Sequence, residues 1–248
     1  MKNTKFFKKG RKIICELFRY DAPIVFITGR FGFGKTDFSL LIAEILLENK
    51  IIKKFGSNIG IKNPQDYPFQ HITNIVQLKK WLYPKTEPKL FILDEAGIHT
   101  DRRNPTGRIN REIRHIGFLL RKFSGKFIFI SQRGEDIDST FAHTDIWLAT
   151  FHKIRKDKAL LFSNVHMNPK LIRNIPRTSI KFDTRDIAPF SLEPTNLSEG
   201  ATTKEEKIFY DWLETGSYHK VGKKYGLFAQ EVKRIVLNQV KALVFSQE

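Results

Sequence analysis

One stretch, Gly29 to Thr36, constrains this chain more than any other. It reads Gly-Arg-Phe-Gly-Phe-Gly-Lys-Thr and matches the phosphate-loop pattern, in which four residues separate a glycine from Gly-Lys-Thr. An apolar run, residues 24–28, precedes the loop, and a longer apolar segment, residues 38–47, follows it. A strand, a glycine-rich turn and a helix in this order let backbone N–H groups surround a phosphate group. The stretch therefore predicts an α/β fold that binds a nucleotide.

The residues of this loop predict the binding of ATP and Mg²⁺. Lys35 is expected to neutralise charge on the β- and γ-phosphates during catalysis, and the hydroxyl of Thr36 to bind Mg²⁺. The helix that begins at the loop would direct the positive end of its dipole toward the same anion. The predicted nucleotide-binding residues are those of the loop and the first residue after it: Gly29, Arg30, Phe31, Gly32, Phe33, Gly34, Lys35, Thr36 and Asp37.

A second apolar run ends in two carboxylates. Residues 89–93 read Lys-Leu-Phe-Ile-Leu and are followed by Asp94 and Glu95, as in a strand that delivers acids to its C-terminal end. The separation from Lys35 leaves room for a helix, a strand and a helix between the two motifs. We predict that Asp94 joins Thr36 in the metal site, by accepting from waters on Mg²⁺. We predict that Glu95 is the general base that polarises the attacking water.

A third apolar run, residues 126–131, ends at Gln132. A polar residue at the end of the strand beside the acidic strand can reach the γ-phosphate or the attacking water. We therefore predict a catalytic role for Gln132. The alternative is an ordinary solvated strand end.

The charge of the chain indicates a polyanionic partner. The net charge is +17 and the isoelectric point is about 9.9, which points most directly to nucleic acid. The excess is concentrated, because residues 101–130 carry eight Lys and Arg against two acids. Most of these eight are arginines beside the nucleotide motifs, so we favour a functional role over a contribution to solubility alone.

The sequence carries no obvious membrane or secretion signal. No apolar stretch reaches the roughly 18 residues of a membrane span. The basic N-terminus lacks the apolar core of a signal peptide. Cys15 is the single cysteine, which excludes an internal disulfide and suits a reducing compartment.

Changes in composition divide the chain into four parts. We predict a basic arm over residues 1–20, an ATPase domain over 21–190, a linker over 191–202 and a helical domain over 203–248. The arm has an apolar stripe that could pack on the core or on a neighbouring subunit, and the sequence leaves both open.

The C-terminal part has the pattern of three short helices. Thr203 begins a capping box, Ser217 can cap a second helix, and Gly226 falls where a helix commonly ends. The last two helices and their tight turn are similar to a helix-turn-helix, in which the final helix enters the major groove of DNA. The residues expected to contact DNA from that helix are Gln230, Lys233 and Arg234. The alternative is a plain helical bundle that acts as a lid or a subunit contact.

Taken together, the loop of residues 29–36, Asp94-Glu95 and Ser131-Gln132 resemble the FtsK–HerA superfamily of DNA-pumping ATPases. Within it the chain looks most like the small genome-packaging ATPases of membrane-containing and archaeal viruses, over roughly residues 20–190. Phe182-Asp183-Thr184 resembles an aromatic-Asp-Thr signature near the end of such domains. The resemblance implies a P-loop NTPase fold of the ASCE/RecA-like kind, a mostly parallel sheet sandwiched by helices.

The resemblance also implies roles for the arginines. In this superfamily an arginine a few residues before the Gln-bearing strand acts in trans as an arginine finger. Arg121 matches this position best, while Arg111 and Arg114 remain rivals. The basic loop would face a central pore and touch DNA phosphates through Arg102, Arg103 and Arg108.

The activity implied by the resemblance is ATP-driven translocation of double-stranded DNA during viral genome packaging. The implied assembly is a homo-oligomeric ring, a hexamer or pentamer, that docks on a capsid or portal-vertex protein in the host cytoplasm or virion. Two features depart from the pattern: the helix-turn-helix-like tail is not general in these ATPases, and the arginine-rich loop before Gln132 does not align.

Three other classes of protein fit parts of the pattern. A Zot-like assembly ATPase of filamentous phages shares this core but usually carries a membrane span. A helicase loader or plasmid-mobilisation ATPase is a second rival. The third is a DNA-binding regulator whose oligomeric state is switched by ATP. The regulator would bind one sequence without DNA-stimulated hydrolysis, whereas a translocase would accept any duplex with a steep salt dependence.

Overall fold

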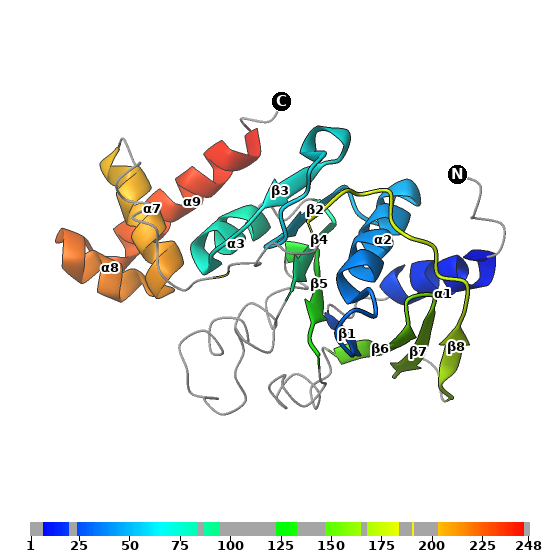
Figure 1. The fold of residues 1–248 in the computed structure, drawn as a ribbon. Helices are drawn as coiled ribbons and strands as arrows, with labels where there is room; N and C mark the ends of the chain where they lie inside the picture. Colours follow the sequence, from blue (N-terminus) through cyan, green and yellow to red (C-terminus); the bar gives the residue numbers. More distant parts are fainter. Residues whose placement is uncertain are drawn as a thin grey trace. The chain divides into compact units, whose positions relative to one another are not determined.

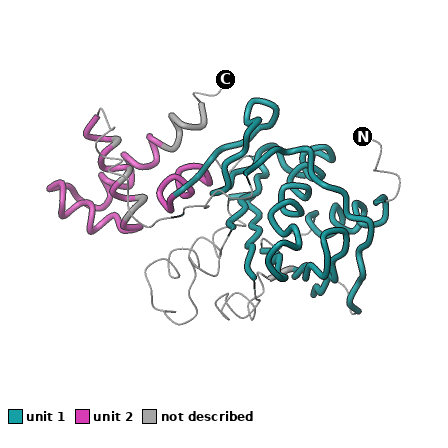
Figure 2. Tube along the Cα trace, in the orientation of Figure 1, with its two compact units in different colours: residues 1–73, 86–190 teal, residues 74–85, 191–248 magenta. Residues whose placement is uncertain are grey.

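The fold is taken from a computed structural model of the chain. The residues that it describes are 7–19, 24–83, 87–94, 123–132, 147–164, 168–183, 190 and 203–245. Contacts group residues 1–73 with 86–190 as unit 1, and residues 74–85 with 191–248 as unit 2 (Figure 2). Each unit has its own hydrophobic core.

Unit 1 is built on an eight-stranded sheet in the order β3-β2-β4-β5-β1-β6-β7-β8 (Figure 1). Neighbouring strands from β3 to β6 are parallel, while β7 and β8 each run antiparallel to the strand before them. The predicted α/β class with a mostly parallel sheet is confirmed. The strands are β1 (Ile24–Gly29), β2 (Lys54–Ser57), β3 (Phe69–His71), β4 (Lys89–Leu93), β5 (Gly125–Ile130), β6 (Trp147–Arg155), β7 (Lys158–Ser163) and β8 (Lys170–Ile172).

The central strands are buried along their length. Every residue of β1 and of β4 is buried, which explains why their sequences are apolar without alternation. Aromatic rings join neighbouring strands in this layer, as between Phe26 of β1 and Phe129 of β5, whose centroids lie 5.8 Å apart. This packing fixes the ends of the central strands relative to one another, and so fixes where the loops that follow them begin.

Two helices of unit 1 pack together beside the sheet (Figure 1). α2 (Lys35–Glu48) follows β1 directly and buries eight of its residues, among them Phe38 and Leu40. α1 (Lys8–Arg19) buries an apolar face that includes Ile14 and Leu17 in the same core. Of the two positions that the sequence left open for this basic segment, the structure has it on the core.

The described residues of unit 2 form a cluster of four helices. They are α3 (Ile75–Leu82), α7 (Lys204–Thr215), α8 (Tyr218–Tyr225) and α9 (Ala229–Phe245). Ile208, Val221 and Val232 are fully buried between α7, α8 and α9. Tyr83, which ends α3, stands edge-on to Trp212 of α7 with ring centroids 5.4 Å apart.

The turns of the C-terminal helices follow their sequence signals. The hydroxyl of Ser217 accepts from the N–H of Lys220 at the start of α8. Gly226 ends α8 with φ 66°, a left-handed conformation that glycine adopts at low cost. Gly222 lies so close to the turn that a Cβ there would sit 2.4 Å from the Leu227 oxygen. The three predicted helices are present, with a tight turn between the last two.

Several short segments connect these elements. β2 ends at Ser57, because residues 58–60 already form the turn that follows. Asn74 caps α3, since its side-chain oxygen accepts from the N–H groups of Val76 and Gln77. An isolated bridge joins Ile61 to Phe182. The predicted linker over 191–202 lies outside the described residues.

Candidate nucleotide site

The loop between β1 and α2 has the backbone that its glycines predict. Gly29, Gly32 and Gly34 have φ angles of 138°, 77° and 71°, all in the region that L side chains rarely adopt. The N–H of Phe33 donates to the oxygen of Arg30 over 3.3 Å and closes the turn. The loop therefore curls back on itself immediately before the first turn of α2.

Gly29 has a second reason to be glycine. It pairs with Lys153 of the neighbouring strand β6, and a Cβ at Gly29 would lie 2.6 Å from the Lys153 backbone oxygen. At Gly32, by contrast, a Cβ would meet nothing within 4 Å. The first glycine is thus fixed by packing as well as by conformation, and the second by conformation alone.

The side chains of the loop point in two directions. Lys35 is half-buried, and its Nζ donates to the oxygen of Arg30 over 3.3 Å, so the lysine folds back over the loop. Phe31 is 85% exposed, and Arg30 is also exposed. Of the predicted nucleotide-binding residues, Lys35 is therefore the one whose charged side chain lies across the turn.

The structure brings together the two residues predicted for the metal site. The Thr36 hydroxyl donates to the Asp94 carboxylate, with Oγ1 and Oδ2 2.6 Å apart. Thr36 lies in the first turn of α2 and Asp94 follows β4, so the contact joins two segments that are far apart in the sequence. A hydroxyl and a carboxylate are hard oxygen ligands of the kind Mg²⁺ prefers, and the pair fits this ion.

Asn58 holds Asp94 in place, and sequence reasoning missed it. Its side-chain oxygen accepts from the N–H of Asp94 over 2.8 Å, and its amide donates to the Asp94 carbonyl oxygen over 3.2 Å. Asn58 is fully buried, and its own backbone oxygen contacts Nε2 of His71 at 3.1 Å. The signal available in the sequence was weak: a polar residue directly after the short strand Lys54–Ser57, which reads Lys-Phe-Gly-Ser.

Gln132 follows β5 and contacts the first residue of the glycine loop. Its backbone oxygen accepts from the N–H of Gly29 over 3.3 Å, and its side chain is exposed. Because β5 lies between β4 and β1, the carboxyl ends of the three strands place Asp94, Gln132 and the loop at one edge of the sheet. The strand with the glutamine separates the strand with the loop from the strand with the acid. The fold is that of the P-loop NTPases.

Some predicted residues lie outside the described part of the chain. These are the general base Glu95, the finger candidates Arg111, Arg114 and Arg121, and the loop residues Arg102, Arg103 and Arg108. Their roles remain predictions.

The predicted DNA-contacting residues of α9 share one exposed face. Gln230, Lys233 and Arg234 are exposed, while Val232 and Val236 are buried against α7 and α8. The side chains are placed as the sequence predicts, and DNA binding through them stays a prediction.

A fully buried lysine lies beneath the site, and no pattern in the sequence indicates it. The Nζ of Lys153 donates to the Lys156 oxygen over 2.7 Å and sits 4.9 Å from the centroid of the Phe38 ring in α2. Burial lowers the pKa of Lys153 to about 8, and Asp37 and Asp157 oppose that fall. The lysine ties β6, which pairs with β1, to the helix that follows the loop.

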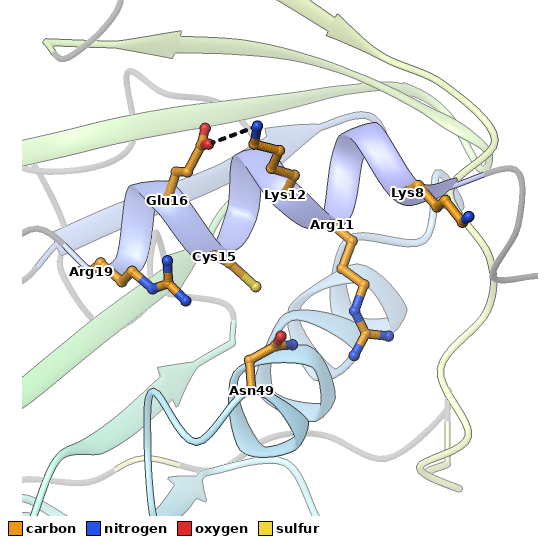
Figure 3. Close-up of a pocket in the computed structure, with 7 residues that line it drawn as sticks. All are labelled: Lys8, Arg11, Lys12, Cys15, Glu16, Arg19 and Asn49. Atoms are coloured by element: carbon orange, nitrogen blue, oxygen red, sulfur yellow. Dashed lines mark ion pairs between the residues drawn. The ribbon is translucent and has the colours of Figure 1, made fainter.

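A cavity of about 330 Å³ lies beside α1 and the end of α2, where Arg11 and Lys12 line it (Figure 3). Cys15 also lines it, but burial raises the pKa of this thiol, so the nucleophilic thiolate is disfavoured. In the part of the chain that the structure describes, no three His, Cys, Asp or Glu side chains cluster as metal ligands. Among the same residues, no helix has the length and apolar character needed to cross a bilayer.

Three solved structures illustrate what the chain is similar to. The genome-packaging NTPase B204 from Sulfolobus turreted icosahedral virus 2, in complex with ATP-gammaS, matches with a TM-score of 0.48 and 13% identity, over 63% of this chain and 99% of that one. The N-terminal domain of zonular occludens toxin from Neisseria meningitidis matches with a TM-score of 0.42 and 17% identity, over 66% and 95%. The cytoplasmic domain of the type VII secretion ATPase EccC from Thermomonospora curvata matches with a TM-score of 0.47 and 11% identity, over 64% and 24%. No protein-family model and no curated protein matches the chain.

Proposed function

We propose that this protein hydrolyses ATP and uses the energy to move double-stranded DNA, as the motor that packages a viral genome. One observation carries the enzymatic part: the Thr36 hydroxyl and the Asp94 carboxylate meet 2.6 Å apart beside the glycine loop. This pair, together with Lys35 above the turn, provides the charged and oxygen groups that phosphoryl transfer needs. The packaging role rests on the motif resemblance described above.

The mechanism follows from the positions of these groups. Water would attack the γ-phosphate in line, while Lys35 and the loop N–H groups hold the phosphate chain. Thr36 and Asp94 would hold Mg²⁺, which neutralises charge on the β- and γ-phosphate oxygens. Glu95, the next residue after Asp94 in the sequence, would orient the attacking water, and Gln132 would sense the γ-phosphate.

Two variants at one position test the metal-site assignment. Thr36→Ser keeps the oxygen, and Thr36→Val removes it in nearly the same volume. We expect Thr36→Val to lower kcat by on the order of 100-fold and Thr36→Ser to stay close to wild type. Steady-state ATP hydrolysis over a Mg²⁺ titration measures both. Equal activity of Thr36→Val and wild type would contradict the assignment.

The ring and the arginine finger need a test of their own. We propose that Arg121 of one subunit completes the site of its neighbour, an arrangement that contributes about 10³-fold or more in related reactions. Glu95→Gln and Arg121→Ala should each be inactive, and mixing them should restore part of the activity, because some interfaces then combine an intact Glu95 with an intact Arg121. Inactive mixtures, or an active Arg121→Ala, would exclude this arginine as a finger in trans; Arg111 and Arg114 would be tested next.

Double-stranded DNA is the proposed partner, and the exposed face of α9 supplies one surface for it. Lys220 and Lys223 of α8 are exposed near Lys233 and Arg234 in sequence, and Glu231 is the one acid over residues 216–238. Lys and Arg on such a helix pair can contact phosphates, while Gln230 can read a base edge. The arginines of the 101–108 loop would form a second surface, facing the pore of the ring.

A charge-matched pair of variants tests the α9 surface. Lys233→Ala with Arg234→Ala should weaken binding to duplex DNA and lower the slope of log K against log salt by about 0.9 for each phosphate that the protein no longer neutralises. Lys204→Ala with Lys207→Ala removes the same charge from exposed positions of α7 and should change binding little. Equal effects of the two double variants on DNA binding would show that only the overall charge matters.

A second candidate function is a DNA-binding regulator switched by ATP. The helix-turn-helix-like arrangement of α8 and α9 favours it, because such helices read specific sequences. The regulator predicts tight binding to one sequence and hydrolysis that duplex DNA does not stimulate. The motor predicts stimulation by long duplexes of unrelated sequence.

A further inference from the structure

The segment after β8 crosses α2. We call residues 173–183 the strap (Figure 1). Ile175 and Ile180 are buried in the core of unit 1, so the strap is anchored on both sides of its middle. The N–H of Ile175 donates to the oxygen of Asp157 in the turn between β6 and β7.

Two carboxylates of α2 bind the middle of the strap. Glu44 accepts from the Thr178 hydroxyl at 2.9 Å and from the Ser179 N–H at 3.1 Å, and also from the Ser179 hydroxyl. Asp37 accepts from the backbone N–H of Thr178. Asp37 and Glu44 are seven residues apart and therefore lie on the same face of the helix, two turns from each other.

Asp37 is an unusual neighbour for a phosphate, because it directly follows Thr36 in the first turn of α2. A carboxylate there repels the anion that the loop is built to bind. The N–H of Thr178 donates to Asp37, so the strap brings the preceding residue, Arg177, beside the first turn of the helix. The side chain of Arg177 is exposed.

The sheet order indicates which end of the nucleotide Arg177 faces. Asp94 and Gln132 follow β4 and β5, on one side of β1. β6 lies on the other side of β1, and the strap joins it there, because the N–H of Ile175 donates to the oxygen of Asp157 in the turn directly after β6. The γ-phosphate must lie near Asp94, so the α-phosphate and the nucleoside leave the loop away from that carboxylate.

We propose that Arg177 binds the α-phosphate of the bound nucleotide, and that the middle of the strap, residues 177–179, forms the nucleoside side of the site. This inference rests on the nucleotide site proposed above. A guanidinium can donate two parallel N–H bonds to phosphate oxygens, which a lysine cannot reproduce. In the nucleotide-bound protein the α-phosphate would share Arg177 with Asp37.

The test compares AMP, ADP and ATP, which share the α-phosphate. Dissociation constants are measured by competition against a fluorescent ADP analogue, for wild type, Arg177→Ala and Arg173→Ala. Arg173 lies at the start of the strap, outside its middle, is also exposed and carries the same charge. We expect Arg177→Ala to weaken all three nucleotides by a similar factor, about tenfold, and Arg173→Ala to leave them unchanged.

Lys35→Ala should change the three affinities in a different way, because Lys35 is expected to contact the β- and γ-phosphates and AMP has neither. It should weaken ATP and ADP far more than AMP. Unchanged affinity in Arg177→Ala, an equal loss of affinity in Arg173→Ala, or a loss of affinity confined to ATP would each overturn the proposal. If the wild type binds no nucleotide, the proposed function fails. If the wild type and Lys35→Ala bind nucleotides as expected, and Arg177→Ala has the same dissociation constants as the wild type, only this inference fails.

Discussion

Gly29 and Gly32 both have positive φ angles, yet they tolerate change differently. Gly29 stands against the backbone of β6, where a Cβ would lie 2.6 Å from the Lys153 oxygen, whereas Gly32 faces open space. Backbone strain at positive φ costs on the order of 1–2 kcal/mol for a residue with a Cβ. A clash with a backbone atom in the middle of a sheet adds to that, because the strands cannot move apart separately.

We predict that Gly29→Ala destabilises the protein by about 3 kcal/mol or more and Gly32→Ala by about 1 kcal/mol. Urea unfolding of the nucleotide-free protein measures both. Gly32→Ala should nevertheless bind ATP poorly, since its Cβ would occupy space inside the loop. Equal stability of the two variants would show that the contact with β6 is relieved by local movement.

The burial of Lys153 should make the free energy of unfolding depend on pH. Its pKa is about 8 in the folded protein and 10.5 in the reference state, because burial penalises the charged form. Between these values the unfolded chain binds more protons than the folded one, so the free energy of unfolding rises with pH through this window. Below about pH 8 both states are protonated, and the contribution of this lysine to the slope disappears.

The measurement compares wild type with Lys153→Met, because Lys89, whose pKa is lowered to about 7, adds a rise of its own in both proteins. The wild type should gain up to about 3 kcal/mol relative to the variant between pH 8 and pH 10.5. Parallel curves over this range would mean that Lys153 keeps its ordinary pKa in the folded protein.

At the scale of elements, the sequence predicts best where long apolar runs adjoin a motif. β1, β4 and β5 were placed within one residue because strands covered on both faces need uninterrupted apolar sequence. β3 was missed because Phe69–His71 is short, lies at the sheet edge and exposes Gln70 and His71. Its single neighbour, β2, is a tertiary partner that the local sequence does not reveal.

The candidate site likewise contains residues that the local sequence predicts and residues that depend on tertiary contacts. The loop and the acidic strand carry patterns that the chemistry itself demands, so Lys35, Thr36 and Asp94 could be named in advance. Asn58 and the strap act through hydrogen bonds between segments distant in the sequence, and their residue types have no fixed spacing from the loop. Such contacts depend on how the strands are ordered, which the sequence alone does not state.

The strap itself predicts a change in proteolysis. Glu44→Ala removes the acceptor for Thr178 and Ser179 and should loosen the chain beside Arg177, a trypsin site. Glu48→Ala is the matched control, because Glu48 lies one turn further along α2 and pairs with Arg11 instead. We expect trypsin to cut after Arg177 several-fold faster in Glu44→Ala only, as measured by mass spectrometry of timed digests. Similar cleavage rates in the two variants would show that the strap is held by its buried isoleucines rather than by Glu44.

At the scale of the whole molecule, the charge of +17 makes binding to DNA the expected behaviour, and it does not separate a motor from a static binder. Both would lose affinity steeply with salt, since both release counterions from phosphates. What separates them is the length of the duplex. For a static binder, a longer duplex has no further effect once the DNA covers the binding footprint. A motor continues to hydrolyse ATP until it reaches the end of the duplex.

We therefore predict that DNA-stimulated hydrolysis increases with duplex length at a constant concentration of base pairs. The rise should begin above the footprint and reach a plateau when dissociation along the duplex becomes more frequent than running off the end. The measurement is steady-state ATP turnover on blunt duplexes from a single footprint to plasmid length, with a closed circle as the limit without ends. A rate that depends only on the concentration of base pairs, equal for short duplexes and circles, would contradict translocation and leave an ATPase that DNA merely activates on contact. A rate that duplex DNA does not change at any length would instead favour the regulator, whose helices α8 and α9 bind a site while ATP controls assembly.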